Sequence, residues 1–434
     1  MTNYKVKIDN FLSKIIDVFK SKFISDSFIT LIATLIVAMI GFVINIVIAK
    51  MYNEEILGIY NQVYSVYNIL FFISLFGFNR TSIKYISESS DSKKRLSIVF
   101  YSVQFSVVII TAIVLSLAYS TIFVFHTALS DRELYIPLVL ILLALPFYVI
   151  NNIIMCTLNG IRSMVSYSVL RMMRWILLII VLLTVTIIFD YYIYIFYSFL
   201  ISETINFLIG LYLLKNKLVK VRLKEIIKRT RVLFRYSTKV FYSQLFNVLK
   251  ERSDVLIIGY FTNNKVAGIY SLMASSVKGL FLIGNVIQQN FNPIFVRKIN
   301  QKEVVNNYIK KLKKYSVLIF IPITICMTIF YYILVENILY DKDFNEYYFE
   351  FLLMTIGGYI FSAYIYAGGL LVMGGELISN IKRTFLVLIA MILLTVILTY
   401  FLNIRGAALA FTSLMFVEVI LLKYYIKKKL KINI

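Results

Sequence analysis

The chain has 434 residues, of which 60% are hydrophobic and 15% charged, a balance too apolar for a water-soluble domain of this length. Two cysteines and a single histidine exclude a disulfide framework, a His-based metal site and a His-based catalytic dyad, so no metal is expected. Lysine and arginine outnumber the acidic residues by 45 to 22. This excess suits either nucleic-acid binding or a membrane protein with basic cytoplasmic loops, and the positions of the charges decide between them.

The first segment, residues 1–27, is predicted to be an amphipathic helix on the cytoplasmic membrane surface. Ile8, Phe11, Ile15 and Phe19 fall on one helical face, and lysines surround that face. The segment is too basic for a cleavable signal peptide and not apolar enough for a span.

Apolar stretches of roughly 20 residues, each long enough to cross a bilayer, recur along the rest of the chain. They predict an all-α polytopic membrane protein with about twelve transmembrane helices in two lobes of six. The N-lobe is expected at 28–214, a basic cytoplasmic linker helix at 215–237 and the C-lobe at 238–434. The seventh span is the least apolar, because four charged residues between Lys250 and Asp254 interrupt it. The predicted spans are 28–49, 56–78, 97–125, 136–158, 165–189, 191–214, 240–261, 266–290, 315–335, 348–370, 384–401 and 404–424.

The basic residues mark one side of the membrane. With the N-terminus inside, most of them fall in cytoplasmic segments and few in outer loops, as in other membrane proteins. Omitting the seventh span would place the two most basic loops on opposite sides. Both termini are therefore predicted to be cytoplasmic, with the linker held to anionic lipid. Nucleic acid is not an expected partner, because the chain offers no soluble domain to bind it.

An internal repeat supports the same division. Asn53–Tyr60 matches Asn263–Tyr270, which lies 210 residues later, and Ser65 matches Ser275 at the same offset. Six spans per repeat is an even number, so the two halves have the same orientation in the membrane. The pattern predicts a parallel repeat about an axis along the membrane normal, with the transport path between the halves.

Charges inside the predicted spans are the candidate functional residues. Facing lipid at a helix centre, each would cost about 2.5–3.5 kcal/mol, so they are expected to face the protein interior, water or one another. Arg171 and Arg174 share a helix face, and the spacing of Lys250 and Asp254 allows an ion pair. The charges inside spans are Arg171, Arg174, Glu203, Lys250, Glu251, Arg252, Asp254, Lys278 and Glu418.

Three of these cations have no acid nearby on their own helices, and we expect them to line a water-filled cavity. They are Arg171, Arg174 and Lys278. Five bases against four acids inside the spans leave a slight cationic excess, which suits an anionic substrate. Asn68 is the repeat partner of Lys278 and is expected to face the same cavity. Structural ion pairs remain the alternative for the charges of the seventh span, and an interhelical hydrogen bond for Asn68.

Prolines and glycine pairs are candidates for bending points. Pro146 lies in the middle of the fourth span, Pro322 lies in the ninth, and Pro293 is expected to close the eighth. Gly357-Gly358 and Gly368-Gly369 lie in the tenth. They could let helices bend during alternating access, and static kinks remain the alternative.

A resemblance to a known family rests on short motifs. Asp254–Phe261 followed by Val266–Ala274 resembles the seventh-to-eighth helix signature of bacterial polysaccharide transporters. Gly58-Ile59-Tyr60 is similar to the matching signature in their first half. With the basic N-terminal helix and the basic linker, the chain resembles, over essentially its full length, the Wzx-type oligosaccharide flippases. These belong to the multidrug/oligosaccharidyl-lipid/polysaccharide (MOP) exporter superfamily.

The resemblance implies a task. Such a flippase moves undecaprenyl-diphosphate-linked oligosaccharide repeat units across the bacterial plasma membrane for O-antigen or capsule synthesis, by alternating access coupled to a Na⁺ or H⁺ gradient. It needs no cofactor, and its expected partners are membrane lipids and the polymerase and chain-length proteins of the pathway. Glu203 and Asp254 are the carboxylates expected to couple an ion. The residues expected to bind substrate are Arg171, Arg174, Lys250, Arg252, Lys278 and Asn68.

Two other functions remain as alternatives. A multidrug exporter of the same superfamily is expected to need acidic residues in its first lobe, where only Glu203 could serve. A membrane polymerase or ligase is expected to carry a long outer loop with catalytic Arg or His, but the longest outer loop here runs roughly from Glu336 to Tyr347. The sequence also holds no nucleotide-binding or nucleophile motif, which argues against an enzyme.

Overall fold

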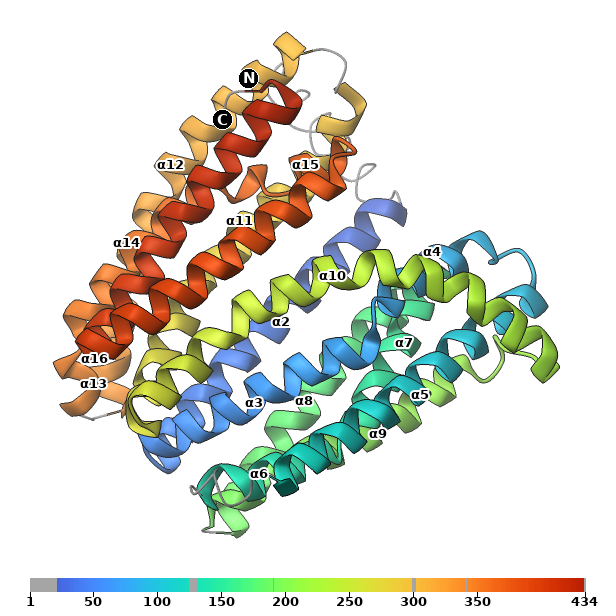
Figure 1. Ribbon diagram of the computed structural model, residues 1–434, viewed down its shortest axis with the longest axis horizontal. Coiled ribbons are helices and arrows are strands. Elements are labelled where there is room, and N and C mark those ends of the chain that lie inside the picture. Colours follow the sequence, from blue (N-terminus) through green and yellow to red (C-terminus); the bar gives the residue numbers. More distant parts are fainter. Residues whose placement is uncertain (1–21, 125–131, 190, 299–301, 340–341, 433–434) are drawn as a thin grey trace, which may run out of the picture.

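The computed structural model describes most of the chain, and all the regular elements it describes are helices (Figure 1). The amphipathic helix predicted at 1–27 lies outside the described residues except for its last few, which begin α2. The described residues are 22–124, 132–189, 191–298, 302–339 and 342–432.

The helices form two bundles that meet at one end, the blue-to-green N-lobe and the orange-to-red C-lobe (Figure 1). We define the N-lobe as α2 to α9 and the C-lobe as α11 to α16, with α10 passing between them. The N-lobe elements are α2 (Lys22–Met51), α3 (Glu54–Leu75), α4 (Phe78–Glu88), α5 (Lys93–Val124), α6 (Arg132–Leu142), α7 (Leu145–Gly160), α8 (Met164–Ile188), η1 (Tyr192–Phe196) and α9 (Tyr197–Leu214). The others are α10 (Leu223–Phe261), α11 (Asn264–Lys298), α12 (Lys302–Ile333), η2 (Leu334–Leu339), α13 (Lys342–Glu346), α14 (Tyr348–Tyr364), η3 (Ile365–Ala367), α15 (Leu370–Met373) and α16 (Leu377–Leu430).

The lengths of the helices suit a multi-pass membrane protein. Among the described residues, nine helices are long and apolar enough to cross a bilayer, and the bent pair α6–α7 makes ten. The 54-residue α16 is interrupted by non-helical backbone at Asn403, so it can supply two spans. The 39-residue α10 corresponds to the predicted seventh span, whose charges lower its hydropathy. The arrangement is consistent with the predicted twelve.

Large apolar side chains cover the outer faces of the helices. Leu117, Ile188 and Leu393 are each more than half exposed. Soluble proteins rarely expose so much contiguous apolar surface, whereas lipid tails accept it. The chain is a multi-pass membrane protein.

Of the prolines expected to mark bending points, Pro146 does lie at a bend. Pro146 lies in the first turn of α7, where α6 and α7 are bent by 44°. Pro322 lies inside the continuous α12. Pro293 does not close the eighth span, because α11 continues to Lys298. Membrane helices tolerate proline where neighbouring groups satisfy the freed backbone carbonyls.

The two halves of the internal repeat contact each other directly through α3 and α11. A methyl group on Gly58 would overlap the backbone oxygen of Asn264, and one on Gly268 would overlap that of Glu54, so glycine is required at both positions. Asn61 Nδ2 donates to Ser271 Oγ over 2.9 Å, and these two residues occupy equivalent positions in the repeat. The two copies of the repeated segment, Asn53–Tyr60 and Asn263–Tyr270, therefore form a contact between the lobes.

The interhelical connections that are rich in lysine and arginine lie at one end of the molecule, where hydrogen bonds join them. Lys93 donates to the backbone oxygen of Asn216, and Lys217 donates to Ser163 Oγ. These contacts join the α4–α5, α7–α8 and α9–α10 connections. At the opposite end, Asn264 of α11 donates to Glu133 of α6 over 3.1 Å.

α10 links the two lobes as one continuous helix that begins inside the predicted linker and ends at Phe261. Its N-terminal half packs on the N-lobe, where Ser237 is 2.7 Å from the hydroxyl of Thr81 and Phe241 stacks on Phe76. Its C-terminal half packs on α16 of the C-lobe, where Phe246 contacts Phe385. The charges of the seventh span therefore lie between the lobes.

Candidate functional site

A cavity of about 500 Å³ lies between the lobes, bounded by α2, α3, α8, α10, α11 and α12. We call it the inter-lobe cavity. One part of its wall is polar and includes Asn45, Asn61, Ser271, Ser275, Glu251, Arg252 and Lys278. The other part is apolar and includes Leu35, Met39, Phe42, Trp175, Met327 and Phe330.

A second cavity of about 560 Å³, the C-lobe cavity, lies mainly between α10, α11, α14 and α16. Glu251, Arg252, Lys278 and Leu282 line both cavities, so the two share a wall made by α10 and α11. The charged residues that line the C-lobe cavity are Lys250, Glu251, Arg252, Asp254, Lys278, Arg383 and Glu418.

Arg252 is the cation most available to a ligand on the shared wall. Its guanidinium lies 5.0 Å from the centre of the Tyr64 ring, a cation–π contact between α10 and α3. Within the described part of the chain it makes no ion pair with a carboxylate. Its guanidinium is therefore held in place by an aromatic ring, and no described carboxylate forms an ion pair with it.

Lys278 and Asp254 form a looser pair beside Arg252. Lys278 Nζ lies 3.4 Å from Asp254 Oδ2, and about a third of the lysine side chain is exposed. Asp254 is buried and also accepts from the hydroxyl of Tyr270 over 3.1 Å and from the backbone N–H of Val255 over 2.9 Å. The pair expected within α10, between Lys250 and Asp254, does not form, because each finds its partner on another helix.

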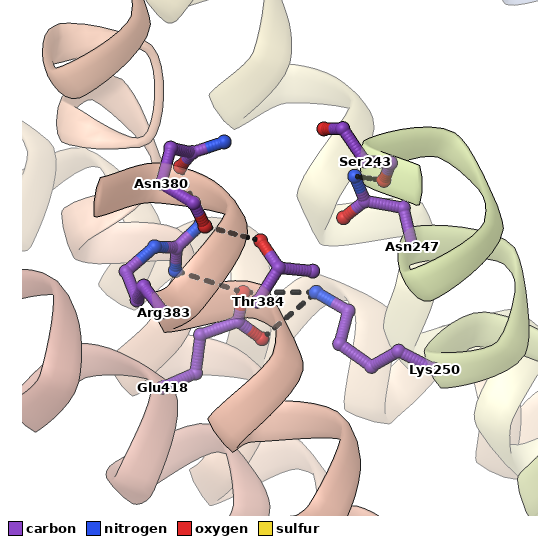
Figure 2. Close-up of polar contacts among 7 residues, drawn as sticks. All are labelled: Ser243, Asn247, Lys250, Asn380, Arg383, Thr384 and Glu418. Atoms are coloured by element: carbon purple, nitrogen blue, oxygen red, sulfur yellow. Dashed lines mark hydrogen bonds and ion pairs between the residues drawn. The ribbon is translucent and has the colours of Figure 1, made fainter. Parts of the chain in front are cut away.

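Lys250 is bound to Glu418, as Figure 2 shows, with Nζ at 2.9 and 3.1 Å from the two carboxylate oxygens. Arg383 Nη1 lies 3.5 Å from the same carboxylate, and its Nη2 donates to Asn380 Oδ1 over 3.3 Å. All three charged side chains are largely buried. Two cations therefore share one acid at the wall of the C-lobe cavity.

The N-lobe holds a separate, closed ion pair. Arg174 Nε of α8 lies 2.8 Å from Glu203 Oε1 of α9, and Asn151 of α7 donates to Glu203 Oε2 over 2.7 Å. The Arg174 guanidinium also lies 4.3 Å from the centre of the Tyr148 ring. Arg174 was expected to lack an acid because none is near it on its own helix, but the neighbouring helix supplies one.

The remaining predicted residues lie apart from both cavities. Arg171 donates to Thr34 Oγ1 over 3.1 Å, which ties α8 to α2. Asn68 is buried and donates to the backbone oxygen of Tyr64 on its own helix. Neither of these residues, nor Arg174 or Glu203, lines the inter-lobe or the C-lobe cavity. The structure thus brings together Lys250, Arg252, Asp254 and Lys278 and separates them from the N-lobe residues.

Arg383 is the charged cavity residue that sequence reasoning missed. The eleventh span was expected to begin at residue 384, which left Arg383 in a cytoplasmic loop. α16 instead begins at Leu377, and Arg383 is buried in its second turn. A span predicted from hydropathy ends where the first charged residue lowers the average. Hydropathy therefore cannot show that the helix extends beyond a cation at the end of an apolar stretch.

The sequence of the chain matches that of one protein family. A sequence model of the family described as polysaccharide biosynthesis protein matches residues 23–296, which is more than half of the chain. No curated protein matches the sequence.

Three solved structures with the same fold are two transporters and a lipid flippase. An inward-facing multidrug resistance MATE family transporter of the MOP superfamily has a TM-score of 0.71 and 12% identity, covering 91% of this chain and 94% of its own. The lipid II flippase MurJ, in an inward closed conformation, has a TM-score of 0.69 and 15% sequence identity. The match covers 91% of this chain and 87% of MurJ. A MOP superfamily transporter from Pyrococcus furiosus has a TM-score of 0.64 and 13% sequence identity. The match covers 93% of this chain and 94% of that transporter. At these identities the likeness shows a shared fold.

Proposed function

Because the chain belongs to the polysaccharide biosynthesis protein family and has the fold of MOP-superfamily transporters, we propose that it is a flippase for oligosaccharides linked to undecaprenyl diphosphate. Family and fold are those of a membrane transporter rather than an enzyme. The observation that carries the proposal is the inter-lobe cavity, which has cations on one part of its wall and apolar side chains on the other.

A lipid-linked sugar has two parts that need opposite surroundings. Moving an unsolvated diphosphate and its sugars through hydrocarbon is prohibitively costly, because charged and hydroxyl groups lose their hydration. Arg252 and Lys278 offer positive charge to the diphosphate, and Asn45, Asn61 and Ser271 offer hydrogen bonds to sugar hydroxyls. The apolar part of the wall suits the first isoprene units of a tail that stays in the bilayer.

The balance of charge at this cavity disfavours a multidrug exporter of cationic compounds. Arg252 and Lys278 line it against the single carboxylate of Glu251. Since Lys278 is already paired with Asp254, Arg252 is the cation that would repel a cationic drug and attract a diphosphate.

The orientation follows from the basic end of the molecule. The connections joined by Lys93 and Lys217 are rich in lysine and arginine, which favours placing that end in the cytoplasm of a bacterial cell, together with both termini. The contact of Gly58 with Gly268 then lies at the outer side, so the lobes are closed outward. The polymerase and chain-length proteins of the pathway would receive the flipped substrate there.

Coupling to a Na⁺ or H⁺ gradient belongs to the same proposal. Asp254 is the first carboxylate to test, because it lies at the C-lobe cavity and is paired with Lys278, which also reaches the substrate cavity. Glu203 is the second, since its only cationic partner among the described residues is Arg174. In Asp254→Asn, transport should lose its dependence on the gradient, while downhill exchange of substrate continues.

Reconstituted vesicles provide the decisive experiment. A fluorescent polyprenyl diphosphate oligosaccharide is placed in one leaflet, and its arrival in the other is followed with an impermeant glycosidase. Vesicles with the wild-type protein should make the inner pool accessible, and Arg252→Gln should slow this about tenfold (roughly 1.4 kcal/mol). If ethidium crosses instead and the sugar lipid does not, the proposed function is wrong.

A further inference from the structure

The Lys250–Glu418–Arg383 cluster at the wall of the C-lobe cavity is not used by the mechanism above. It is built on three helical segments: Lys250 on α10, and Arg383 and Glu418 on the two halves of α16 (Figure 2). The exposed fractions of the three side chains are 16%, 9% and 5%. Two buried cations with one buried acid leave an excess positive charge, which is costly in a membrane interior unless a second anion compensates it.

Arg383 is the member of the cluster whose hydrogen bonds are incomplete. Its contacts to Glu418 and Asn380, at 3.5 and 3.3 Å, are longer than the roughly 2.7–2.9 Å of a charge-assisted hydrogen bond. Its Nε is buried and finds no partner among the described residues. Arg383 lines the C-lobe cavity, and its long contacts to Glu418 and Asn380 leave donors of its guanidinium for an anion there.

The rest of the cavity has the chemistry of a sugar site. Asn247, Asn285 and Gln288 line it, and their amides can each donate to and accept from hydroxyl groups. The shared wall with Arg252 and Lys278 connects it to the inter-lobe cavity, where the proposed function puts the diphosphate. A ligand held there by its diphosphate could extend its sugars into the C-lobe cavity.

We propose that the C-lobe cavity selects an acidic sugar of the repeat unit and that its carboxylate binds Arg383 beside Lys250. This inference rests on the proposed function and names its substrate class. One carboxylate matches the single excess charge of the cluster, whereas the diphosphate faces Arg252 on the shared wall, with Lys278 and its partner Asp254 beside it. Glu251 also lines the cavity, but its side chain is exposed to solvent and its charge is screened accordingly.

The test compares two synthetic polyprenyl diphosphate disaccharides that end in glucose or in glucuronate. Their dissociation constants are measured on the full-length protein in nanodiscs. The wild type should bind the glucuronate probe at least about tenfold more tightly. Arg383→Gln should bring the two constants together by weakening only the acidic probe. Glu418→Gln should widen the gap, because it frees both cations.

The opposite responses of the two variants separate ligand binding from a structural role, which would make both variants lose affinity for both probes. Lys94→Gln, which removes an exposed cation that lines neither cavity, should leave the ratio unchanged. Equal binding of both probes to the wild type would overturn this inference but leave the flippase proposal intact. Competition by inorganic phosphate, but not by free glucuronate, would assign the site to phosphate and also overturn it. Failure to bind or move either probe would refute the proposed function itself.

Discussion

The N-lobe and the C-lobe bury their charges in different ways. In the N-lobe, Arg174 and Glu203 are matched one to one, and Asn151 fills a further position on the carboxylate. In the C-lobe, Lys250 and Arg383 share Glu418 at the wall of a cavity. A balanced pair away from both cavities suits a structural role, whereas an unbalanced cluster beside a cavity suits a ligand.

The lobes are nevertheless alike where they meet. Gly58 and Gly268 occupy equivalent positions in the repeat and bring α3 and α11 into the same close approach. Asn61 and Ser271 are also equivalent and hydrogen-bond to each other. The comparison teaches that duplication preserved the contact surface while the charged interiors diverged, so function is to be sought in the interior that is out of balance.

The largest effect is expected from breaking the balanced pair. Glu203→Ala leaves Arg174 buried without its acid and should destabilise the protein by about 3–5 kcal/mol. The measurement is thermal unfolding of the purified protein in detergent. Replacing both charges, as Arg174→Met with Glu203→Leu, should restore stability to within about 1 kcal/mol of the wild type. A single variant as stable as the double variant would show that the N-lobe pair is not structural.

The sequence predicted the architecture better than the pairing of charges. The apolar stretches and the Asn53–Tyr60 repeat were enough to predict two helical lobes. The structure adds that the two copies of this repeat contact each other. Partners on different helices were out of reach, because Lys250 and Glu418 are separated by 168 positions and helical spacing identifies neighbours only within one helix. Arg383 was not predicted for another reason. By hydropathy, a charged residue at the end of an apolar stretch cannot be distinguished from a loop residue.

A smaller loss is expected at the contact that the lobes share. Gly268→Ala forces its methyl group into the backbone of Glu54 and should cost about 1–3 kcal/mol through overpacking. Gly279→Ala is the matched control, because it lies on the same helix and its methyl group would meet nothing within 4 Å. Unfolding of both variants in detergent tests this, and equal stability would mean that close approach of α3 and α11 is not required.

The cavity residues should separate activity from stability. Lys278→Ala removes a cation whose side chain is 35% exposed from beside the buried Asp254. Asp254 keeps its hydrogen bonds from Tyr270 and Val255, so the protein should lose less stability than the roughly 3–5 kcal/mol expected for Glu203→Ala. Transport of the lipid-linked oligosaccharide in vesicles should fall about tenfold, equivalent to roughly 1.4 kcal/mol in binding. A loss of stability as large as that of Glu203→Ala would place Lys278 with the structural charges of the N-lobe instead.

The smallest effect is expected where α10 rests on the N-lobe at the basic end. Lys94 hydrogen-bonds to Glu225 over 3.1 Å and lowers the pKa of that partly exposed carboxyl. Because the pKa is lowered in the folded state, the contact contributes fully above the ordinary glutamate value of about 4.3 and is lost as the pH falls through the lowered value. Hydrogen exchange at the start of α10 should therefore be faster in Glu225→Gln than in the wild type near neutral pH. The two should converge in acid or at high salt, since an exposed ion pair is screened. A difference that persists at low pH would mean that the carboxylate charge is not what holds this end of α10 to the N-lobe.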